Sequence, residues 1–175
     1  MKRLFALLLV LMMLAFAGCS EEIVHTEALD TLMAVRYEGQ SDRMTQLAPQ
    51  AYWDWYENQG RSIEDLVAYS EGAYYSWVNI MSSQYGEALE VTYTVTDQDD
   101  MDSETFAAVV NGLERYGIQS DAVENGRILT VDETIDGSKL TETQEKEYML
   151  VAIEGKDYIV YFEETDTGLT VYFRM

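Results

Sequence analysis

The chain has 175 residues, and its 32 aspartate and glutamate residues against 11 lysine and arginine residues give a formal net charge of −21. Such a charge argues against a nucleic-acid-binding protein and against adsorption to anionic lipid, because both partners are themselves negatively charged. The 47% hydrophobic and 12% aromatic content predicts a folded core and argues against disorder.

The first nineteen residues predict export from the cytoplasm. Lys2 and Arg3 form a short positive segment, and an uninterrupted apolar run follows from Leu4 to Ala17. The run of about fourteen residues fits the hydrophobic region of a signal peptide and is shorter than the roughly 20 residues that span a membrane. Gly18 and Cys19 follow it, and Cys19 is the single cysteine of the sequence.

This end of the leader resembles the bacterial lipobox, with Phe16 standing where an aliphatic residue is usual. The resemblance implies a lipoprotein in which a diacylglycerol is attached to the sulfur of Cys19, acyl chains such as palmitate anchor the protein, and the leader is removed. The alternatives are an ordinary secretory signal with a chance cysteine, or a leader kept as a membrane anchor. One cysteine permits no disulfide within the chain, so the fold must rest on its hydrophobic core.

The lipobox resemblance divides the chain into a signal peptide (residues 1–18), a short tether with the lipidated cysteine (19–24) and a single domain (25–175). It implies a location on the extracytoplasmic face of the cell membrane, or at the outer membrane of a Gram-negative cell, since Ser20 follows the cysteine. Loss of the leader removes Lys2 and Arg3 and leaves 9 basic against 32 acidic residues, a net charge of −23.

The N-terminal part of the domain predicts helices. Thr26 is a candidate N-cap of a first helix, and residues 51–57 form the most aromatic segment of the chain. A long helix is expected to begin after Ser62 and to end at Gly86. Gly72 lies inside this helix, where close packing by another element is one reason for a glycine.

The remaining chain is rich in predicted strands. Residues 88–96 alternate apolar and polar side chains, as in a half-buried strand, and an acidic loop over residues 97–102 leads to a helix over residues 104–116, capped by Asp102 or Ser103. Further strands, joined by short turns, are predicted over residues 127–135, 140–153, 158–163 and 169–174. The predicted fold is α+β, with N-terminal helices packed on a curved antiparallel sheet of about five strands.

This order of elements over about residues 25–175 resembles the nuclear-transport-factor-2-like, or cystatin-like, fold. The helix over residues 104–116, which follows a single strand, departs from that order. The resemblance implies a concave pocket between helices and sheet. Because this fold hosts binding modules, assembly domains and enzymes, the resemblance names no activity.

Aromatic residues of the 51–57 segment and of the long helix form the candidate ligand site. Tryptophan and tyrosine combine a large apolar body with a polar tip, which suits peptides, sugars or apolar ligands. The residues predicted to bind a ligand are Trp53, Trp55, Tyr56, Tyr74 and Trp77. The alternative is that most of them belong to the core. Trp53 and Trp55 cannot face the same side of a helix, so one of the two is expected to be exposed.

Candidates for metal binding and catalysis are weaker. The acidic loop offers oxygen ligands for Ca²⁺ from Asp97, Asp99, Asp100 and Asp102, but a solvated turn explains it equally well. The single histidine, His25, lies beside the tether, so acid–base catalysis by histidine is not expected. Enzymes of the ketosteroid-isomerase kind, which share the resembled fold, use a buried carboxylate with a tyrosine, and Asp54 or Asp132 could imitate this pair.

The sequence therefore predicts a lipid-anchored, extracytoplasmic binding or protein-interaction module of the bacterial cell envelope. We predict no catalytic residue, no cofactor and no nucleic-acid partner. The expected partners are the membrane, through the lipid on Cys19, and either a small ligand or peptide or a neighbouring envelope protein. The alternatives are an isomerase- or hydrolase-like enzyme with a carboxylate–tyrosine site in the pocket, and a structural homodimer.

Overall fold

The computed structural model describes residues 26–165 and 168–175, so the predicted leader, Cys19 and His25 lie outside the described residues. The helical elements of the first half are α2 (Glu27–Tyr37), the 3-10 helix η1 (Ser41–Leu47), α3 (Gln50–Asn58) and α4 (Ile63–Tyr85). The elements of the second half are β1 (Glu90–Asp100), α5 (Ser103–Leu113), the 3-10 turns η2 (Glu114–Tyr116) and η3 (Ser120–Ala122), β2 (Val123–Asp136), β3 (Thr141–Ile153), β4 (Lys156–Thr165) and β5 (Gly168–Phe173).

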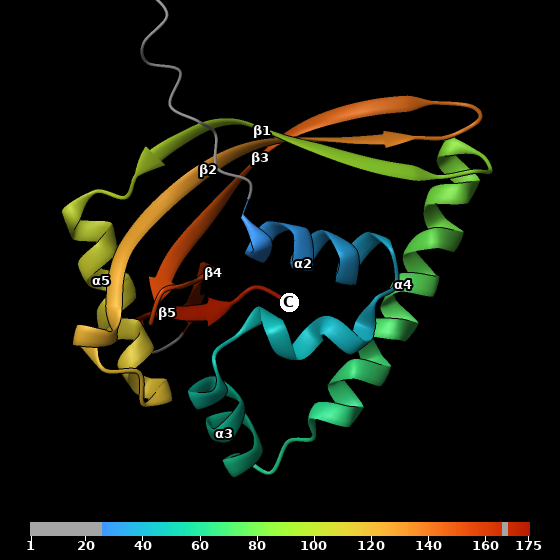
Figure 1. The fold of residues 1–175 in the computed structure, drawn as a ribbon. Helices are drawn as coiled ribbons and strands as arrows, with labels where there is room; N and C mark the ends of the chain where they lie inside the picture. Colours follow the sequence, from blue (N-terminus) through green and yellow to red (C-terminus); the bar gives the residue numbers. More distant parts are fainter. Residues whose placement is uncertain (1–25, 166–167) are drawn as a thin grey trace, which may run out of the picture.

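The described strands form one antiparallel sheet in the order β1-β2-β3-β4-β5. Each strand therefore pairs with its neighbour in the sequence, and among the described connections only the one from β1 to β2 contains a helix. Figure 1 shows the long strands β1, β2 and β3 curving over α2, with α5 and α4 at opposite ends of the molecule. The predicted α+β class, with helices packed on a curved antiparallel sheet, is confirmed.

Polar side chains begin three of the helices, as predicted. The hydroxyl of Thr26 accepts a hydrogen bond from the backbone N–H of Leu29 at the start of α2, and that of Ser62 accepts one from Asp65 at the start of α4. The carboxylate of Asp102 accepts hydrogen bonds from the first backbone N–H groups of α5. These bonds satisfy donors that the first turn of a helix leaves without a partner.

The end of β1 differs from the prediction. The sequence predicts a loop over residues 97–102, but β1 continues to Asp100. After a register shift between Val95 and Asp97, the strand stays paired with β2 until Asp100 lies opposite Arg127. Backbone groups make these hydrogen bonds, so acidic side chains that reach solvent do not end the strand.

Helix α2 lies at the centre of the core. Most of its residues are buried, and Leu29 and Leu32 have no exposed surface. Leu129 and Val131 of β2 belong to the same buried cluster, on the face of the sheet that curves over the helix. A helix that is apolar on nearly all sides needs cover from several elements. The curved sheet, the 3-10 helix η1 and helix α4 provide that cover.

Helix α4 is long but little covered. Its only buried residue is Tyr85, near its end, whereas the side chains of Tyr69, Tyr75 and Ile80 are 76%, 59% and 59% exposed. In the described part of the chain, no helix is both long and apolar enough to cross a membrane. The helix contributes little to the core, and one of its sides forms the wall of a surface pocket.

Two glycines in helices have opposite surroundings. A Cβ atom at Gly72 in α4 would meet no atom within 4 Å, so close packing does not explain this glycine. A Cβ atom at Gly112 in α5 would lie 2.9 Å from the Cβ atom of Val171 in β5. The close approach of helix and strand is therefore at Gly112.

We expect alanine to change stability in opposite directions at these two positions. Gly72→Ala removes the cost of glycine in an exposed helix and should raise the free energy of unfolding by up to about 1 kcal/mol. Gly112→Ala pushes α5 away from β5 and should lower the free energy of unfolding by about 1–3 kcal/mol. Chemical denaturation of the protein without its leader measures both changes. A Gly112→Ala variant as stable as the wild type would show that the two elements do not pack closely.

Candidate functional site

Trp53, one of the predicted ligand-binding residues, is part of the core. It is 2% exposed, and its indole Nε1–H donates hydrogen bonds to the backbone oxygens of Thr45 at 2.9 Å and Ala48 at 3.1 Å. A buried tryptophan whose N–H is already satisfied offers no surface to a ligand.

Trp55 and Tyr56 of α3 are half-buried and pack against the core. The guanidinium of Arg61 lies 6.0 Å from the ring centroid of Trp55 and 5.3 Å from that of Tyr56, and Arg115 lies 5.5 Å from Trp55. These are cation–π distances. Trp55 and Arg115 border a shallow hollow of about 320 Å³, which is separate from the site of the predicted residues in α4.

Tyr74 and Trp77 of α4 line a second pocket together with Tyr37 of α2. The ring centroids of Tyr37 and Trp77 are 5.1 Å apart, and those of Tyr74 and Trp77, which are stacked, are 6.4 Å apart. This pocket, named here the aromatic pocket, has a volume of about 300 Å³ and is completed by Val35, Arg36, Ser70, Ala73 and Met175. Two of the five predicted residues thus share this pocket, and the structure adds Tyr37 to them.

A third pocket, named here the arginine pocket, adjoins the aromatic pocket and shares Arg36 and Met175 with it. Its volume is about 390 Å³, and it is lined by Arg36, Tyr52, Tyr161, Tyr172, Phe173, Arg174 and Met175. Figure 1 shows the C-terminus, which contributes to both pockets, in the space framed by α2, α4 and β5. Among the described residues that line this pocket, none is an aspartate or a glutamate.

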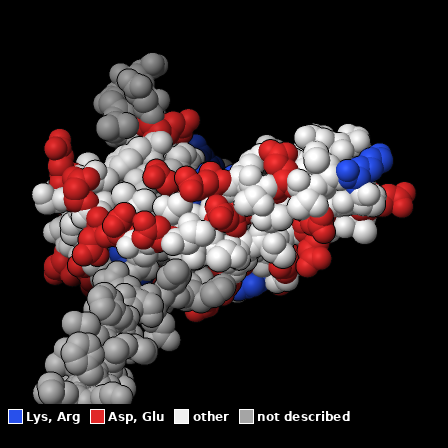
Figure 2. All heavy atoms as spheres, turned by 90° about the horizontal axis from the view of Figure 1, so that it is seen from above, with Lys and Arg blue, Asp and Glu red and all other residues white. Residues whose placement is uncertain are grey.

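The positive charge of the arginine pocket is local. Among the described residues, ion pairs join Arg127 to Asp157 and Lys146 to Glu133, and neither arginine of the pocket takes part in one. Figure 2, which views the molecule from above, shows a face scattered with acidic side chains and few basic ones. The two pocket arginines therefore contrast with a predominantly acidic protein.

Glu133 of β2 is a buried carboxylate at the centre of a hydrogen-bond cluster. Its side chain is 2% exposed. It accepts hydrogen bonds from the hydroxyl of Tyr37 at 2.8 Å, from the ammonium of Lys146 at 2.5 Å and from the hydroxyl of Tyr148. Donors from α2 and β3 thus converge on one carboxylate of β2.

These contacts determine the protonation of the Glu133 cluster. Burial favours a higher pKa for Glu133, but hydrogen bonds from Lys146, Tyr148 and Tyr37 outweigh it and hold the pKa below its ordinary value. Burial, together with Glu133 itself, raises the pKa of both tyrosines. At neutral pH the carboxylate is therefore a weak base with neutral tyrosine donors, which suits a positioning role better than proton transfer.

The Glu133 cluster contacts both pockets. Tyr37 lines the aromatic pocket. The ring centroid of Tyr148 lies 4.9 Å from the guanidinium carbon of Arg174, which lines the arginine pocket. Glu133 therefore holds one residue of the first pocket directly and one residue of the second through Tyr148.

Neither carboxylate proposed from the sequence for a carboxylate–tyrosine pair forms the buried site. Asp54 is exposed and accepts a hydrogen bond from Gln50 of its own helix at 2.7 Å. Asp132 neighbours Glu133 on β2, and successive side chains of a strand point to opposite faces. The buried positions Leu129, Val131 and Glu133 alternate along β2, so the same period would have identified Glu133 as inward-facing.

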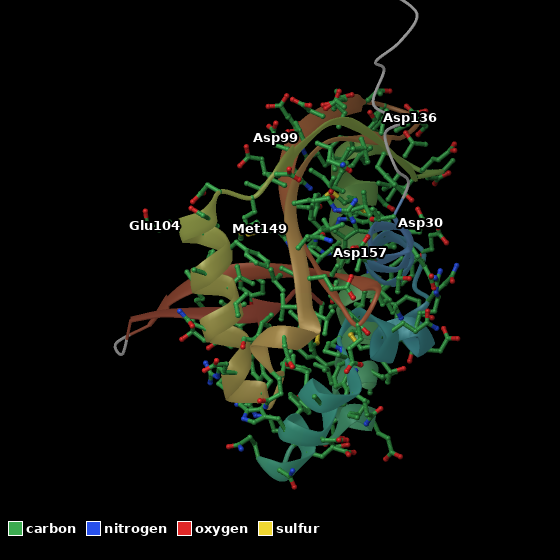
Figure 3. All side chains as sticks on the ribbon, turned by 60° about the vertical axis from the view of Figure 1, so that its left-hand side comes forward. Asp30, Asp99, Glu104, Asp136, Met149 and Asp157 are labelled. Carbon is green, nitrogen blue, oxygen red and sulfur yellow. The ribbon has the colours of Figure 1, made fainter. Side chains whose placement is uncertain are left out.

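The acidic residues proposed for Ca²⁺ do not converge. Asp97, Asp99 and Asp100 belong to β1, where alternation directs neighbouring side chains to opposite faces, and Asp102 caps α5. Figure 3 shows Asp99 at the outside of the sheet and Glu104 projecting from α5. In the described ranges no three histidine, cysteine, aspartate or glutamate residues could hold a metal ion together. This arrangement gives the weak Ca²⁺ candidate no support.

Comparisons of the chain with family models, with curated proteins and with solved structures found no match. The resemblances to the lipobox and to the nuclear-transport-factor-2-like fold stay predictions. The chemistry of the two adjoining pockets is therefore the basis for a functional proposal.

We expect Glu133→Gln to destabilise the fold at neutral pH. The amide loses the charge and turns N–H groups toward donors that need an acceptor, which should cost about 1–3 kcal/mol. The exposed Glu145 of β3 supplies the matched control, because Glu145→Gln removes the same charge outside the cluster. Chemical denaturation of both variants measures the difference.

The stability difference between the wild type and Glu133→Gln should depend on pH. The pKa of Glu133 in the folded protein lies below its ordinary value of 4.5, so its stabilising effect is present above about that pH and is lost as the pH falls through the folded pKa. The stability gap between wild type and Glu133→Gln should therefore narrow in acid. A gap that is constant or widens would contradict an ionised, hydrogen-bonded Glu133.

Proposed function

We propose that the protein is a lipid-anchored, extracytoplasmic binding module of the bacterial cell envelope that holds a small ligand in the aromatic pocket. The observation that carries this proposal is the pocket formed by Tyr37, Tyr74 and Trp77, whose rings form its apolar walls. Ligand sites typically have volumes of about 300–1,000 Å³. The aromatic pocket alone, at about 300 Å³, lies at the lower limit of that range, and the adjoining arginine pocket adds about 390 Å³.

The state of Glu133 favours binding over catalysis. An enzyme of the carboxylate–tyrosine kind needs a carboxylate that reaches the substrate and accepts a proton. Glu133 lines none of the three pockets described above, and three donors already occupy it. Its position supports a structural role behind the binding site.

A protein-contact role is the second candidate, and the surface of α4 favours it. Residues 72–86 contain no charged side chain, although Glu71 and Glu87 flank them. Tyr75 and Ile80 of this segment are exposed. Such a surface in an acidic protein suits contact with another protein, and the molar mass of the domain in solution distinguishes a homodimer from a monomer with another partner.

The lipid anchor predicts the fate of a Cys19→Ala variant. The wild-type protein should incorporate labelled palmitate and remain with membranes, because its acyl chains supply the attachment that its acidic surface cannot. Cys19→Ala should lose the label, and Ser20→Ala should keep it. Mass spectrometry of the N-terminal peptide should place the cleavage before Cys19. Cleavage elsewhere, or an unlabelled wild type, would support one of the other two interpretations of the leader.

Ligand binding in the aromatic pocket can be tested with phenylnaphthylamine, a neutral aromatic probe whose fluorescence rises in apolar surroundings. We expect saturable binding to the wild type. Ser70→Phe fills the pocket and should weaken binding by about tenfold or more, which corresponds to about 1.4 kcal/mol. Ala68→Phe adds the same ring to an exposed position of α4 that does not line the pocket, and it should leave binding unchanged. Equal loss in both variants would count against the pocket.

A further inference from the structure

We propose that the ligand is an anionic amphiphile, whose negatively charged group binds Arg36 and Arg174 while its apolar part occupies the aromatic pocket. This inference rests on the proposed function and adds the chemical class of the ligand. The charged group could be a carboxylate, a sulfonate or a phosphate, because all three present oxygen atoms to a guanidinium in a similar geometry.

The first observation is the contact between the pockets. Arg36 and Met175 line both of them, so a molecule seated on Trp77 extends directly toward the two guanidinium groups. Arg36 immediately precedes Tyr37 at the end of α2. One turn of helix thus supplies an apolar wall to one pocket and a positive charge to the boundary between them.

The second observation is that the arginines lack carboxylate partners in an acid-rich protein. With 32 acidic residues in the chain, ion pairs would be easy to form, yet the described residues provide none to Arg36 or Arg174. A terminal carboxylate on Met175 would neutralise the charge of one guanidinium group, and the charge of the second would remain. Arginine presents a planar fork of N–H donors that matches an anionic oxygen pair, so an external anion is the partner that this arrangement fits.

The third observation is that the pocket is preorganised for an anion. The ring of Tyr148 holds Arg174 from one side, and the Glu133 cluster behind it carries its own cation, Lys146, so it does not neutralise the pocket. Burial raises the pKa of Tyr52, which lines the same pocket, to about 12. Its hydroxyl stays protonated at neutral pH and can donate a hydrogen bond to the anion.

Two probes with the same aromatic body separate the charge from the apolar part. Phenylnaphthylamine is neutral, and anilinonaphthalene sulfonate is its sulfonated relative. We expect the wild-type protein to bind the sulfonate more tightly, because only the sulfonate reaches the guanidinium groups. Arg36→Gln and Arg174→Gln should each weaken sulfonate binding by about three- to tenfold.

Matched controls test whether a loss of sulfonate affinity comes from the two pocket arginines. Arg174 lines the arginine pocket and not the aromatic pocket, so Arg174→Gln should bind phenylnaphthylamine as the wild type does. Arg36 lines both pockets, so for Arg36→Gln the measure is the ratio of the sulfonate affinity to the phenylnaphthylamine affinity, which should fall. Lys139→Gln removes one positive charge from the exposed β2–β3 turn and should change the affinity for neither probe. A general effect of net charge would appear equally in Lys139→Gln and in the arginine variants.

The outcomes for the two proposals are distinguishable. Failure of both probes to bind would overturn the proposed function together with the inference. Equal affinity for the two probes, with no effect of Arg36→Gln or Arg174→Gln on the sulfonate, would overturn the inference and leave the binding function standing. Tighter sulfonate binding that is lost in both arginine variants but kept in Lys139→Gln would support it.

Discussion

The buried carboxylate of Glu133 is the interaction on which the pocket region depends. A buried anion is tolerated only when hydrogen-bond donors replace the water molecules that it has lost. Removing one of these donors leaves part of the buried charge without a partner. The donors come from Tyr37 at the end of α2 and from Lys146 and Tyr148 on β3. The need to satisfy one carboxylate therefore fixes the end of the central helix against the sheet, and this end carries Arg36 into the pockets.

Aromatic rings, more than carboxylates, surround the basic residues. Arg61, Arg115, Arg174 and Lys156 lie over tyrosine or tryptophan rings at distances of 4.9–6.0 Å, whereas two described basic residues form ion pairs. A ring orients a cation without cancelling its charge, as a carboxylate would. The arrangement keeps positive charge available inside a protein whose net charge is −21.

Local signals in the sequence were sufficient for the architecture. Caps such as Thr26 and Ser62 and the alternation along the strands predicted the helices, the sheet and the fold class, because those signals act within a few residues. The site was predicted less well. Tyr74 and Trp77 were expected, but Arg36 and Arg174 lie near opposite ends of the domain's sequence and come to line one pocket only through folding. The sequence did not predict where β1 ends, because the strand's length is determined by its backbone pairing with β2.

The contrast between an acidic protein and a positive pocket has a consequence for selectivity. At physiological ionic strength charges act over about 8 Å, so an approaching anion meets the repulsion of the surface before it meets the two guanidinium groups. A small bare anion gains only the contact with the arginines, and this gain must offset that repulsion. An anion attached to an aromatic body also gains the burial of its rings against Tyr37 and Trp77. For the proposed ligand class the two parts together should bind more tightly than either part alone, so we expect the acidic surface to disfavour inorganic anions and the adjoining pockets to favour amphiphilic ones.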